Sequence, residues 1–240
     1  MRLERFIKIY LPVILRYGSV SNHPLLRTLE GVNAGSVAKR ILHSSEFGVC
    51  YFRMPKAGSS TVLATLGYNI FKREVSPAFV QKKLHRLPSM EEIREAFTFT
   101  IMRHPESRVL SAYLDKSRSM RFHKKFPFLG HSPGTQKGFL YFLDALEDGA
   151  LYSNTHWAPQ AAILPIPPED LDFVGRFETF EQDLQHCMSR IFTNPTEIKN
   201  HRPHQTRSHD IASGFVNGIA TDKIRHMYRS DFALFYPQDQ

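Results

Sequence analysis

The segment from Tyr51 to Gly67, YFRMPKAGSSTVLATLG, carries residue types that bind an anion. An apolar run typical of a strand, residues 47–54, leads into a short loop, and a run that can form a helix follows at 61–71. The first N–H groups of a helix have no partner within it, and the helix dipole adds partial positive charge beside them. Lys56 adds a full charge, and Gly58 lets the backbone approach a ligand closely. The residues predicted to bind a phosphate-bearing ligand are Lys56, Ala57, Gly58, Ser59, Ser60 and Thr61.

This loop does not match a Walker A loop, which reads G-x-x-x-x-G-K-[ST] and places its Ser or Thr on Mg²⁺. Here Lys56 precedes Gly58, and no glycine opens the loop. The sequence therefore favours a phosphate ligand other than ATP with magnesium. A strand–turn–helix junction with a solvated lysine is the structural alternative, since such junctions are frequent in α/β folds.

A second group of polar residues follows another predicted strand, FTFTIM at 97–102. The strand ends at Arg103, and Pro105 is suited to the first position of a helix, predicted at 106–118. Ser111 lies on that helix. Because an arginine can make two charged hydrogen bonds to a phosphate, Arg103 and Ser111 can bind a second phosphate. Arg108 can help them, or it can be a solvated helix residue.

The remaining pattern alternates strands with helices. A third strand is predicted at 171–177, and a helix start at Thr179 has Gln182 at the capping-box spacing. Further predictions are a loop or short helix at 20–45, a surface loop at 118–138 and a helix at 138–147. A final helix is expected to begin at Thr221 and to share one apolar face among Ile224, Met227, Tyr228 and Phe232. This order indicates an α/β protein with a mostly parallel sheet, helices on both faces and ligands at the carboxyl ends of the strands.

The length of 240 residues predicts a single domain, 1–240, with an N-terminal helical flank at 1–45 and a catalytic core at 46–240. A net charge of +8 favours anionic partners without selecting among nucleotides, acidic glycans, nucleic acids and membranes. The two cysteines, Cys50 in a predicted strand and Cys187 in a predicted helix, indicate no disulfide framework. We therefore expect a reducing, cytoplasmic location.

The N-terminal segment, MRLERFIKIYLPVILRYG, is apolar but interrupted by Lys8 and Pro12 and closed by Arg16. No small-residue cleavage site follows, so neither a membrane span nor a cleaved signal is expected. We predict an amphipathic helix that packs on the body of the protein. Because basic residues accompany its apolar ones, peripheral contact with a membrane is the alternative.

Taken together, the motifs resemble a known family. RMPKAGSST (53–61) and FTIMRHPESRVLSAYLDKS (99–117) are similar to the 5′-phosphosulfate loop and the 3′-phosphate motif of carbohydrate sulfotransferases that use 3′-phosphoadenosine 5′-phosphosulfate (PAPS). The similarity is to the branch related to the chondroitin 4-O and HNK-1 enzymes. It extends through NTHWAPQ (154–160), DFVGRFETFEQDL (172–184) and IRHMYRSDFALF (224–235), and so covers about 47–235.

The resemblance implies a P-loop-like three-layer fold and transfer of a sulfuryl group from PAPS to a hydroxyl of a carbohydrate or glycan-bearing acceptor. Lys56 and Gly58–Thr61 would hold the 5′-phosphosulfate, and Arg103 and Ser111 the 3′-phosphate. Animal enzymes of this branch begin with a membrane anchor and carry several cysteines. Neither feature is present in this sequence, so a soluble, bacterial-type member is expected.

Sulfuryl transfer, like phosphoryl transfer, depends on positioning and on cationic stabilisation of developing charge. Lys56 is the candidate to stabilise the leaving phosphate oxygen, and no metal is expected. His156 is the candidate general base, with Trp157 beside it as a sugar-stacking surface. His85 is an alternative base, and His104 is expected to support the phosphate site.

Two basic stretches, 116–125 and 199–209, either line a cleft for an acidic acceptor, close over the nucleotide, or form solvated loops. Two other functions fit parts of the sequence. A P-loop-like nucleotide-dependent kinase is one, and a basic nucleic-acid-binding module is the other. The aromatic residues mostly fall within helix and strand patterns and form no obvious stacking platform, so no nucleic acid is expected as partner.

Overall fold

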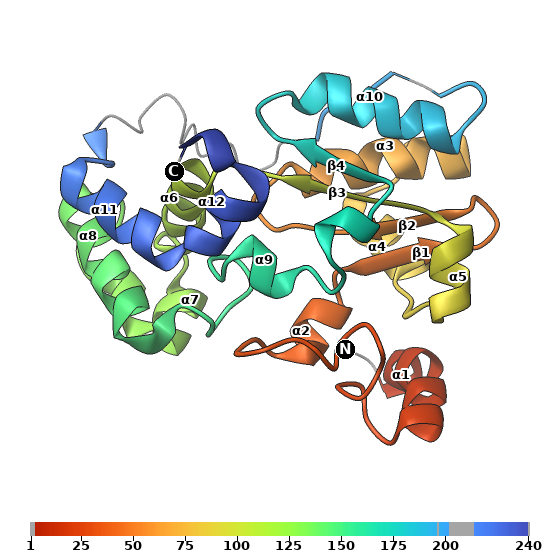
Figure 1. Cartoon of the computed structure of the whole chain (residues 1–240), viewed down its shortest axis with the longest axis horizontal. Coiled ribbons are helices and arrows are strands. Elements are labelled where there is room, and N and C mark those ends of the chain that lie inside the picture. Colours follow the sequence, from red (N-terminus) through yellow and green to blue (C-terminus); the bar gives the residue numbers. More distant parts are fainter. Residues whose placement is uncertain (1–2, 196, 202–213, 240) are drawn as a thin grey trace. The chain divides into compact units, whose positions relative to one another are not determined.

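The computed structural model of the chain describes residues 3–195, 197–201 and 214–239 (Figure 1). The chain forms two compact units. Unit 1 comprises Met1–Met102 and Ala162–Arg202, and unit 2 comprises Arg103–Ala161 and Pro203–Gln240. The single domain expected over 1–240 stays a prediction.

A four-stranded sheet forms the centre of unit 1. Its strands are β1 (Ile41–Ser44), β2 (Val49–Phe52), β3 (Phe97–Met102) and β4 (Phe173–Arg176), in the order β1-β2-β3-β4. β2, β3 and β4 are parallel, and β1 is antiparallel to β2. The three predicted strands and the mostly parallel sheet are confirmed.

The prediction of a loop or short helix over 20–45 missed β1. This strand is only four residues long and contains His43 and Ser44, so it has no clear period-two pattern. It is held by pairing with β2, in which Ile41 faces Phe52 and Ser44 faces Val49. Its place in the sheet therefore depends on its partner rather than on its own residues.

Helices flank the sheet of unit 1, as Figure 1 shows for α3 and α10. The helices of unit 1 are α1 (Leu3–Tyr17), α2 (Ala34–Ala38), α3 (Ser59–Phe71), α4 (Pro77–Leu84), α5 (Met90–Glu95) and α10 (Phe180–Ile191), with the 3-10 turn η3 (Pro168–Asp170). α4 packs on α3 and β1, whereas α10 packs on β3 and β4. This arrangement confirms the predicted α/β class with a P-loop-like, mostly parallel central sheet.

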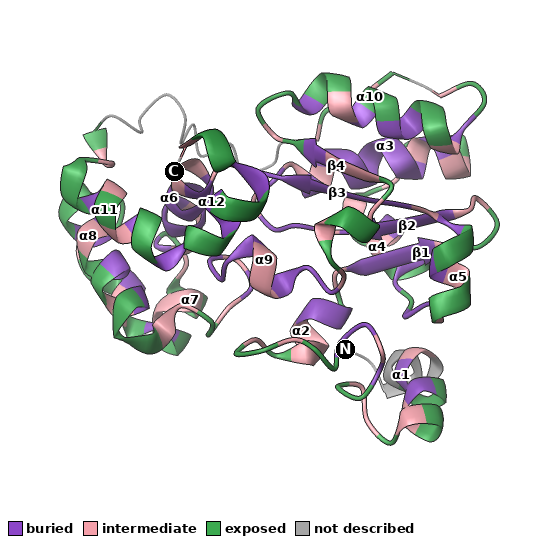
Figure 2. Cartoon of the chain, in the orientation of Figure 1, coloured by how far each residue is buried: buried purple, intermediate pink, exposed green. Residues whose placement is uncertain are grey.

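The core of unit 1 lies along the strands, which are drawn as buried over nearly all of β1, β2 and β3 (Figure 2). Tyr51 of β2 stacks on Phe99 of β3 at 4.6 Å between ring centroids. The Thr100 hydroxyl donates to the Phe52 carbonyl at 2.8 Å, which satisfies a polar group inside the sheet. These contacts fix the ends of β2 and β3, from which the chain leaves at the same edge.

Unit 2 is helical. Its elements are α6 (Pro105–Lys116), α7 (Met120–Lys125), η1 (Pro127–Gly130), α8 (Gln136–Ala145), the π-helical turn η2 (Leu146–Ala150), α11 (Gly218–Met227), α12 (Arg229–Phe235) and η5 (Pro237–Asp239). α6, α8 and α11 pack on one another. The short helix α9 (Gln160–Ile163) stands where the chain passes from unit 2 back to unit 1.

The predicted surface loop at 118–138 is wrong in part, because it contains α7 and η1. Phe126 and Leu129 are buried, and the Phe126 ring meets the Trp157 ring edge to face at 4.9 Å. Aromatic burial therefore orders a segment whose basic and turn-forming residues indicated a loop.

Two helix starts also differ from prediction. Thr179 does precede α10, but its hydroxyl donates to the Asp183 carboxylate at 2.8 Å instead of forming the expected capping box. The final helix begins at Gly218 rather than Thr221, because the Asn217 side chain caps it by accepting from the Ala220 N–H. The expected apolar face of Ile224, Met227, Tyr228 and Phe232 is buried, although it is divided between α11, its C-cap and α12.

Candidate functional site

The loop between β2 and α3 contains two residues in the left-handed backbone region. Lys56 has φ 68° and Gly58 has φ 72°. Such a conformation is uncommon for a residue other than glycine, and it persists only where the surrounding structure holds it. The Gly58 carbonyl accepts from the N–H groups of Thr61 and Val62, so the helix begins directly after it. Lys56 thus stands just before the positive end of a 13-residue helix.

Phe180 at the start of α10 packs directly on Gly58. A Cβ atom at position 58 would lie 2.3 Å from Cε2 of the Phe180 ring, which no ordinary contact allows. Glycine is therefore needed at this position both for its backbone conformation and for its close approach to an aromatic ring. Nothing local in the sequence indicates that Phe180 supports the loop, because the two residues are far apart along the chain.

The predicted hydroxyl residues do not share one environment. Ser59 and Thr61 are buried, whereas Ser60 is half-buried. The Thr61 hydroxyl donates to the His201 carbonyl at 3.2 Å and accepts from the His201 N–H at 3.4 Å. In this structure the Thr61 side chain therefore fixes a neighbouring segment of the protein.

That segment is the start of the second basic stretch. The Lys199 N–H donates to the Thr65 hydroxyl at 3.1 Å, and its Nζ lies 4.2 Å from the centroid of the Tyr68 ring. Residues 199–201 therefore lie along α3, the helix that begins at the loop. The remainder of the stretch, 202–209, lies outside the described residues.

In unit 2, Arg103 follows the last residue of β3. Its side chain is almost fully buried, and its Nε donates to the Ser107 hydroxyl at 3.0 Å. Ser107 in turn donates to the His104 carbonyl at 3.1 Å. Ser111 is also buried on α6, the helix that starts at Pro105. The Arg103 side chain is thus held against the first turn of the helix that carries Ser111.

Arg108 is neither a solvated residue nor a candidate for ligand contact. It is fully buried and donates to the carbonyls of Ala158 and Thr155 at 2.9 and 3.2 Å. Burial lowers its pKa, while the nearby Asp231 carboxylate opposes that shift. Arg108 therefore holds the NTHWAPQ segment against α6.

His156 is held by Asn154 within the same segment. The Asn154 Oδ1 accepts the backbone N–H of His156 at 3.0 Å and lies 2.8 Å from its Nδ1. Because Oδ1 acts as an acceptor, we assign the proton of the neutral ring to Nδ1, which makes Nε2 the basic nitrogen. This is the tautomer that a general base needs if it is to take a proton at Nε2.

Trp157 does not offer a sugar-stacking surface, so that prediction is wrong. The side chain is fully buried, and its Nε1 donates to the Ala150 carbonyl at 3.0 Å. The aromatic neighbour of His156 is instead Phe122 of α7, edge to face at 6.1 Å. Lys116 Nζ lies 4.6 Å from the Phe122 centroid. Both residues belong to the first basic stretch, 116–125, so part of that stretch lies near His156.

The other two histidines have structural contacts. His85 in unit 1 is buried between the Tyr10 hydroxyl, 3.0 Å from Nε2, and the Ile41 carbonyl, 3.3 Å from Nδ1. This environment favours a structural role over that of a base. His104 packs edge to face on Phe232 and Tyr236.

The described part of the chain holds no group of three or more His, Cys, Asp or Glu side chains arranged to bind a metal ion. Among the helices described, none is both long enough and apolar enough to span a bilayer.

A mostly parallel sheet with a left-handed loop between a strand and the N-terminus of a helix defines a P-loop-like α/β protein. A model of the sulfotransferase family matches residues 39–237, and the chain therefore belongs to that family. The match runs through segments of both units. Comparison with curated proteins and with solved structures gave no match. Family membership makes the protein a transferase of sulfuryl groups.

Proposed function

We propose that this sulfotransferase moves a sulfuryl group from PAPS to a hydroxyl of a carbohydrate or glycan-bearing acceptor. The observation that carries the proposal is the loop from Lys56 to Gly58, which sets a lysine and a left-handed glycine at the start of α3. A helix N-terminus with an adjacent lysine suits the charge of a phosphosulfate. The resemblance of RMPKAGSST to a 5′-phosphosulfate loop agrees with this chemistry.

In this proposal each end of the nucleotide has its own residues. Lys56, Ala57, Gly58, Ser59, Ser60 and Thr61 hold the 5′-phosphosulfate, and Arg103 and Ser111 hold the 3′-phosphate. During transfer the acceptor oxygen bonds to sulfur while the bond from sulfur to the phosphate oxygen breaks. Negative charge then grows on the phosphate oxygen, and Lys56 stabilises it. The scheme requires no metal ion.

His156 is the proposed general base. Its Nε2 takes the proton of the acceptor hydroxyl as the new bond to sulfur forms, and Asn154 keeps the other ring nitrogen protonated. The cytoplasmic location is likewise our proposal. It is supported by Cys50 and Cys187, which are buried free thiols whose pKa burial raises to about 12.

Replacing Lys56 with alanine tests the proposal. Lys56→Ala keeps a non-glycine residue in the left-handed region and removes the side-chain ammonium group with its aliphatic stem, so the fold should persist while sulfate transfer falls by at least about a hundredfold. Lys72→Ala is the matched control, since Lys72 is exposed and has φ 53° at the other end of the same helix. The control should keep the wild-type rate, measured as transfer of labelled sulfate from PAPS.

Ligand-dependent thermal unfolding provides a test without turnover. 3′-Phosphoadenosine 5′-phosphate should raise the unfolding temperature, because a ligand that binds only the folded state stabilises it. If magnesium and ATP stabilised the protein while this nucleotide did not, the kinase alternative would replace our proposal. A wild-type transfer rate in Lys56→Ala would also refute it.

We also propose that α1 contacts an anionic membrane surface. Ile7, Leu11 and Leu15 are exposed at helical spacing, whereas Tyr10 and Val13 on the other side are buried. Arg16 is exposed at the end of the helix, and basic residues on an amphipathic helix favour anionic lipid.

The protein should sediment with vesicles that contain phosphatidylserine and not with phosphatidylcholine alone. Leu11→Glu with Leu15→Glu should abolish this, and unchanged sedimentation would refute the contact.

A further inference from the structure

The backbone of Arg103 is held by a side chain from a distant part of unit 2. Gln160 is fully buried, and its amide contacts both polar groups of the Arg103 backbone. The Arg103 N–H donates to Oε1 at 3.0 Å, and Nε2 donates to the Arg103 carbonyl at 2.8 Å. Arg103 lies one residue beyond the end of β3 at Met102. The Gln160 amide therefore forms the hydrogen bonds that the Arg103 N–H and C=O would make with a neighbouring strand if β3 continued.

Gln160 is itself fixed by Asp231 of α12. The Asp231 Oδ2 accepts the Gln160 backbone N–H at 2.8 Å and its Nε2 at 3.3 Å, while Oδ1 accepts the Ala161 N–H at 2.8 Å. Since Nε2 donates both to this carboxylate and to the Arg103 carbonyl, Oε1 must face the Arg103 N–H. The orientation of the amide is therefore determined by its partners.

The carboxylate of Asp231 is fully buried, so its negative charge must be stabilised by a nearby positive charge and by hydrogen-bond donors. Burial raises its pKa, and the Arg108 guanidinium together with the three N–H donors opposes that shift. A buried charge that loses its partner is strongly destabilising, so Asp231 and Arg108 depend on each other. The carboxylate is consequently a rigid anchor for the segment that ends at Gln160.

The Arg103 side chain is held independently, by Ser107 at its Nε. An arginine that binds phosphate through directional hydrogen bonds loses affinity when its position shifts by a fraction of an ångström. We infer that Gln160 and Asp231 are positioning residues for Arg103 and thereby set the affinity of the enzyme for the 3′-phosphate of the nucleotide. This inference rests on the proposed function, in which Arg103 binds that phosphate.

The affinity ratio between two nucleotides measures this effect. 3′-Phosphoadenosine 5′-phosphate and adenosine 5′-phosphate differ only in the 3′-phosphate, so their ratio isolates its contribution. Gln160→Met keeps the length of the side chain and removes both contacts to Arg103. We expect it to lower the ratio by roughly tenfold, the scale of a displaced charged hydrogen bond. Calorimetric titration of the folded variants gives both affinities.

Tyr228→Phe is the matched control. The Tyr228 hydroxyl is fully buried and donates to the Trp157 carbonyl in the same segment, but it has no bond to Gln160 or Asp231 among those described. This variant should lower the unfolding temperature and leave the affinity ratio unchanged. Asp231→Asn replaces one acceptor oxygen by an NH2 group and removes the charge opposite Arg108, so it should lower the unfolding temperature. In the folded variant the ratio should lie between those of the wild type and Gln160→Met.

Combination with Arg103→Ala separates the inference from the proposed function. In the Arg103→Ala background, Gln160→Met should have no further effect on the ratio, because the group that it positions is gone. If wild type does not prefer the 3′-phosphorylated nucleotide, or Arg103→Ala leaves the preference intact, the proposed 3′-phosphate site is wrong. If Arg103→Ala removes the preference while Gln160→Met retains it, only the positioning role is overturned.

Discussion

In the β2–α3 loop, individual residues determine both the backbone conformation and the local charge. Lys56 and Gly58 are both left-handed, and Phe180 leaves no room for a side chain at position 58. The polar types in this loop could be identified from the sequence because they are adjacent. The support from Phe180 could not, since it depends on how α10 packs.

Gly58→Ala should destabilise the protein for two reasons. The left-handed backbone costs about 1–2 kcal/mol for alanine, and the clash with Phe180 adds about 1–3 kcal/mol. Urea unfolding should therefore show a loss of about 2–5 kcal/mol, together with weaker nucleotide binding.

Gly48→Ala separates the two contributions. Gly48 has φ 55°, and a Cβ there would meet nothing within 4 Å, so only the backbone cost of about 1–2 kcal/mol applies. Phe180→Ala should relieve part of the loss in Gly58→Ala. Equal losses in Gly58→Ala and Gly48→Ala would show that the Phe180 contact is unimportant.

His156 should affect the rate of transfer without affecting nucleotide affinity. We expect His156→Gln to lower kcat by at least about a hundredfold, the usual contribution of a general base. Asn154→Ala should have a smaller effect, because it removes only the acceptor that selects the tautomer. Steady-state kinetics and nucleotide titration test both variants, with His131→Gln on the surface of unit 2 as control. A kcat close to wild type in His156→Gln would exclude it as the base.

At the level of elements, local sequence signals predicted those helices and strands that have their own pattern. The strand FTFTIM and the helix after Pro105 were predicted within a residue or two. β1 and α7 were not, because pairing with β2 and burial of Phe126 determine them. The sequence thus defines an element well when its ordering forces are local, and poorly when they come from distant partners.

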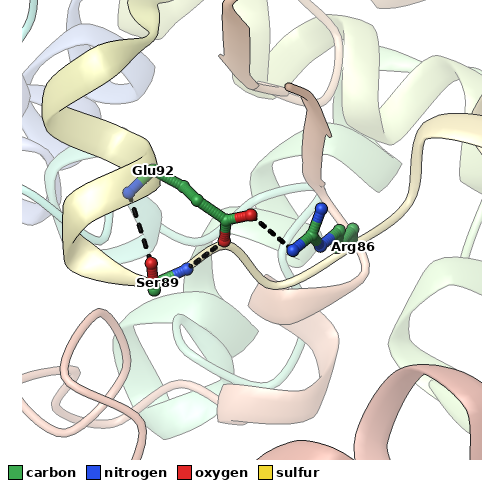
Figure 3. Close-up of polar contacts among 3 residues, drawn as sticks. All are labelled: Arg86, Ser89 and Glu92. Atoms are coloured by element: carbon green, nitrogen blue, oxygen red, sulfur yellow. Dashed lines mark hydrogen bonds and ion pairs between the residues drawn. The ribbon is translucent and has the colours of Figure 1, made fainter. Parts of the chain in front are cut away.

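The start of α5 has a capping box formed by Ser89 and Glu92, and its contribution to the free energy of unfolding can be measured. Figure 3 shows the Ser89 hydroxyl accepting the Glu92 N–H, while the Glu92 carboxylate accepts the Ser89 N–H and pairs with Arg86. Ser89→Ala should cost about 1 kcal/mol of unfolding free energy, the usual cost of losing an N-cap. Ser119 stands at the start of α7 without a side-chain cap bond, so Ser119→Ala should stay within about 0.5 kcal/mol of wild type. Urea denaturation would refute this role of Ser89 if both variants had the same stability.

At the level of the whole molecule, the candidate site relies on contacts between segments far apart in sequence. Residues 103 and 160 are 57 apart, and residues 160 and 231 are 71 apart. The sequence predicted Arg103 from its place after a strand, because that signal is local. It gave no indication of Gln160 or Asp231 beyond the occurrence of both in the segments that resemble the family, since a buried hydrogen-bond network is recognised only once the chain is folded.

Two buried histidines should make stability depend on pH. Burial lowers the pKa of His43, with a smaller opposing effect of Glu92 and a further lowering by Arg86. Burial also lowers the pKa of His23, opposed by a hydrogen bond with the backbone of Pro88, while Arg16 lowers it further. The unfolded chain therefore binds protons at a higher pH than the folded protein, so stability is full above the ordinary histidine pKa of about 6.5 and falls as pH decreases below it.

Urea unfolding at pH 7.5 and 5.5 tests this dependence. The wild type should lose unfolding free energy between the two values, and His43→Gln should lose less, because glutamine does not titrate. At pH 8.5 and 7.5 both histidines are neutral in the folded and unfolded states, so the difference between the two proteins should stay constant there. An equal loss in both proteins between pH 7.5 and 5.5 would show that His43 does not contribute.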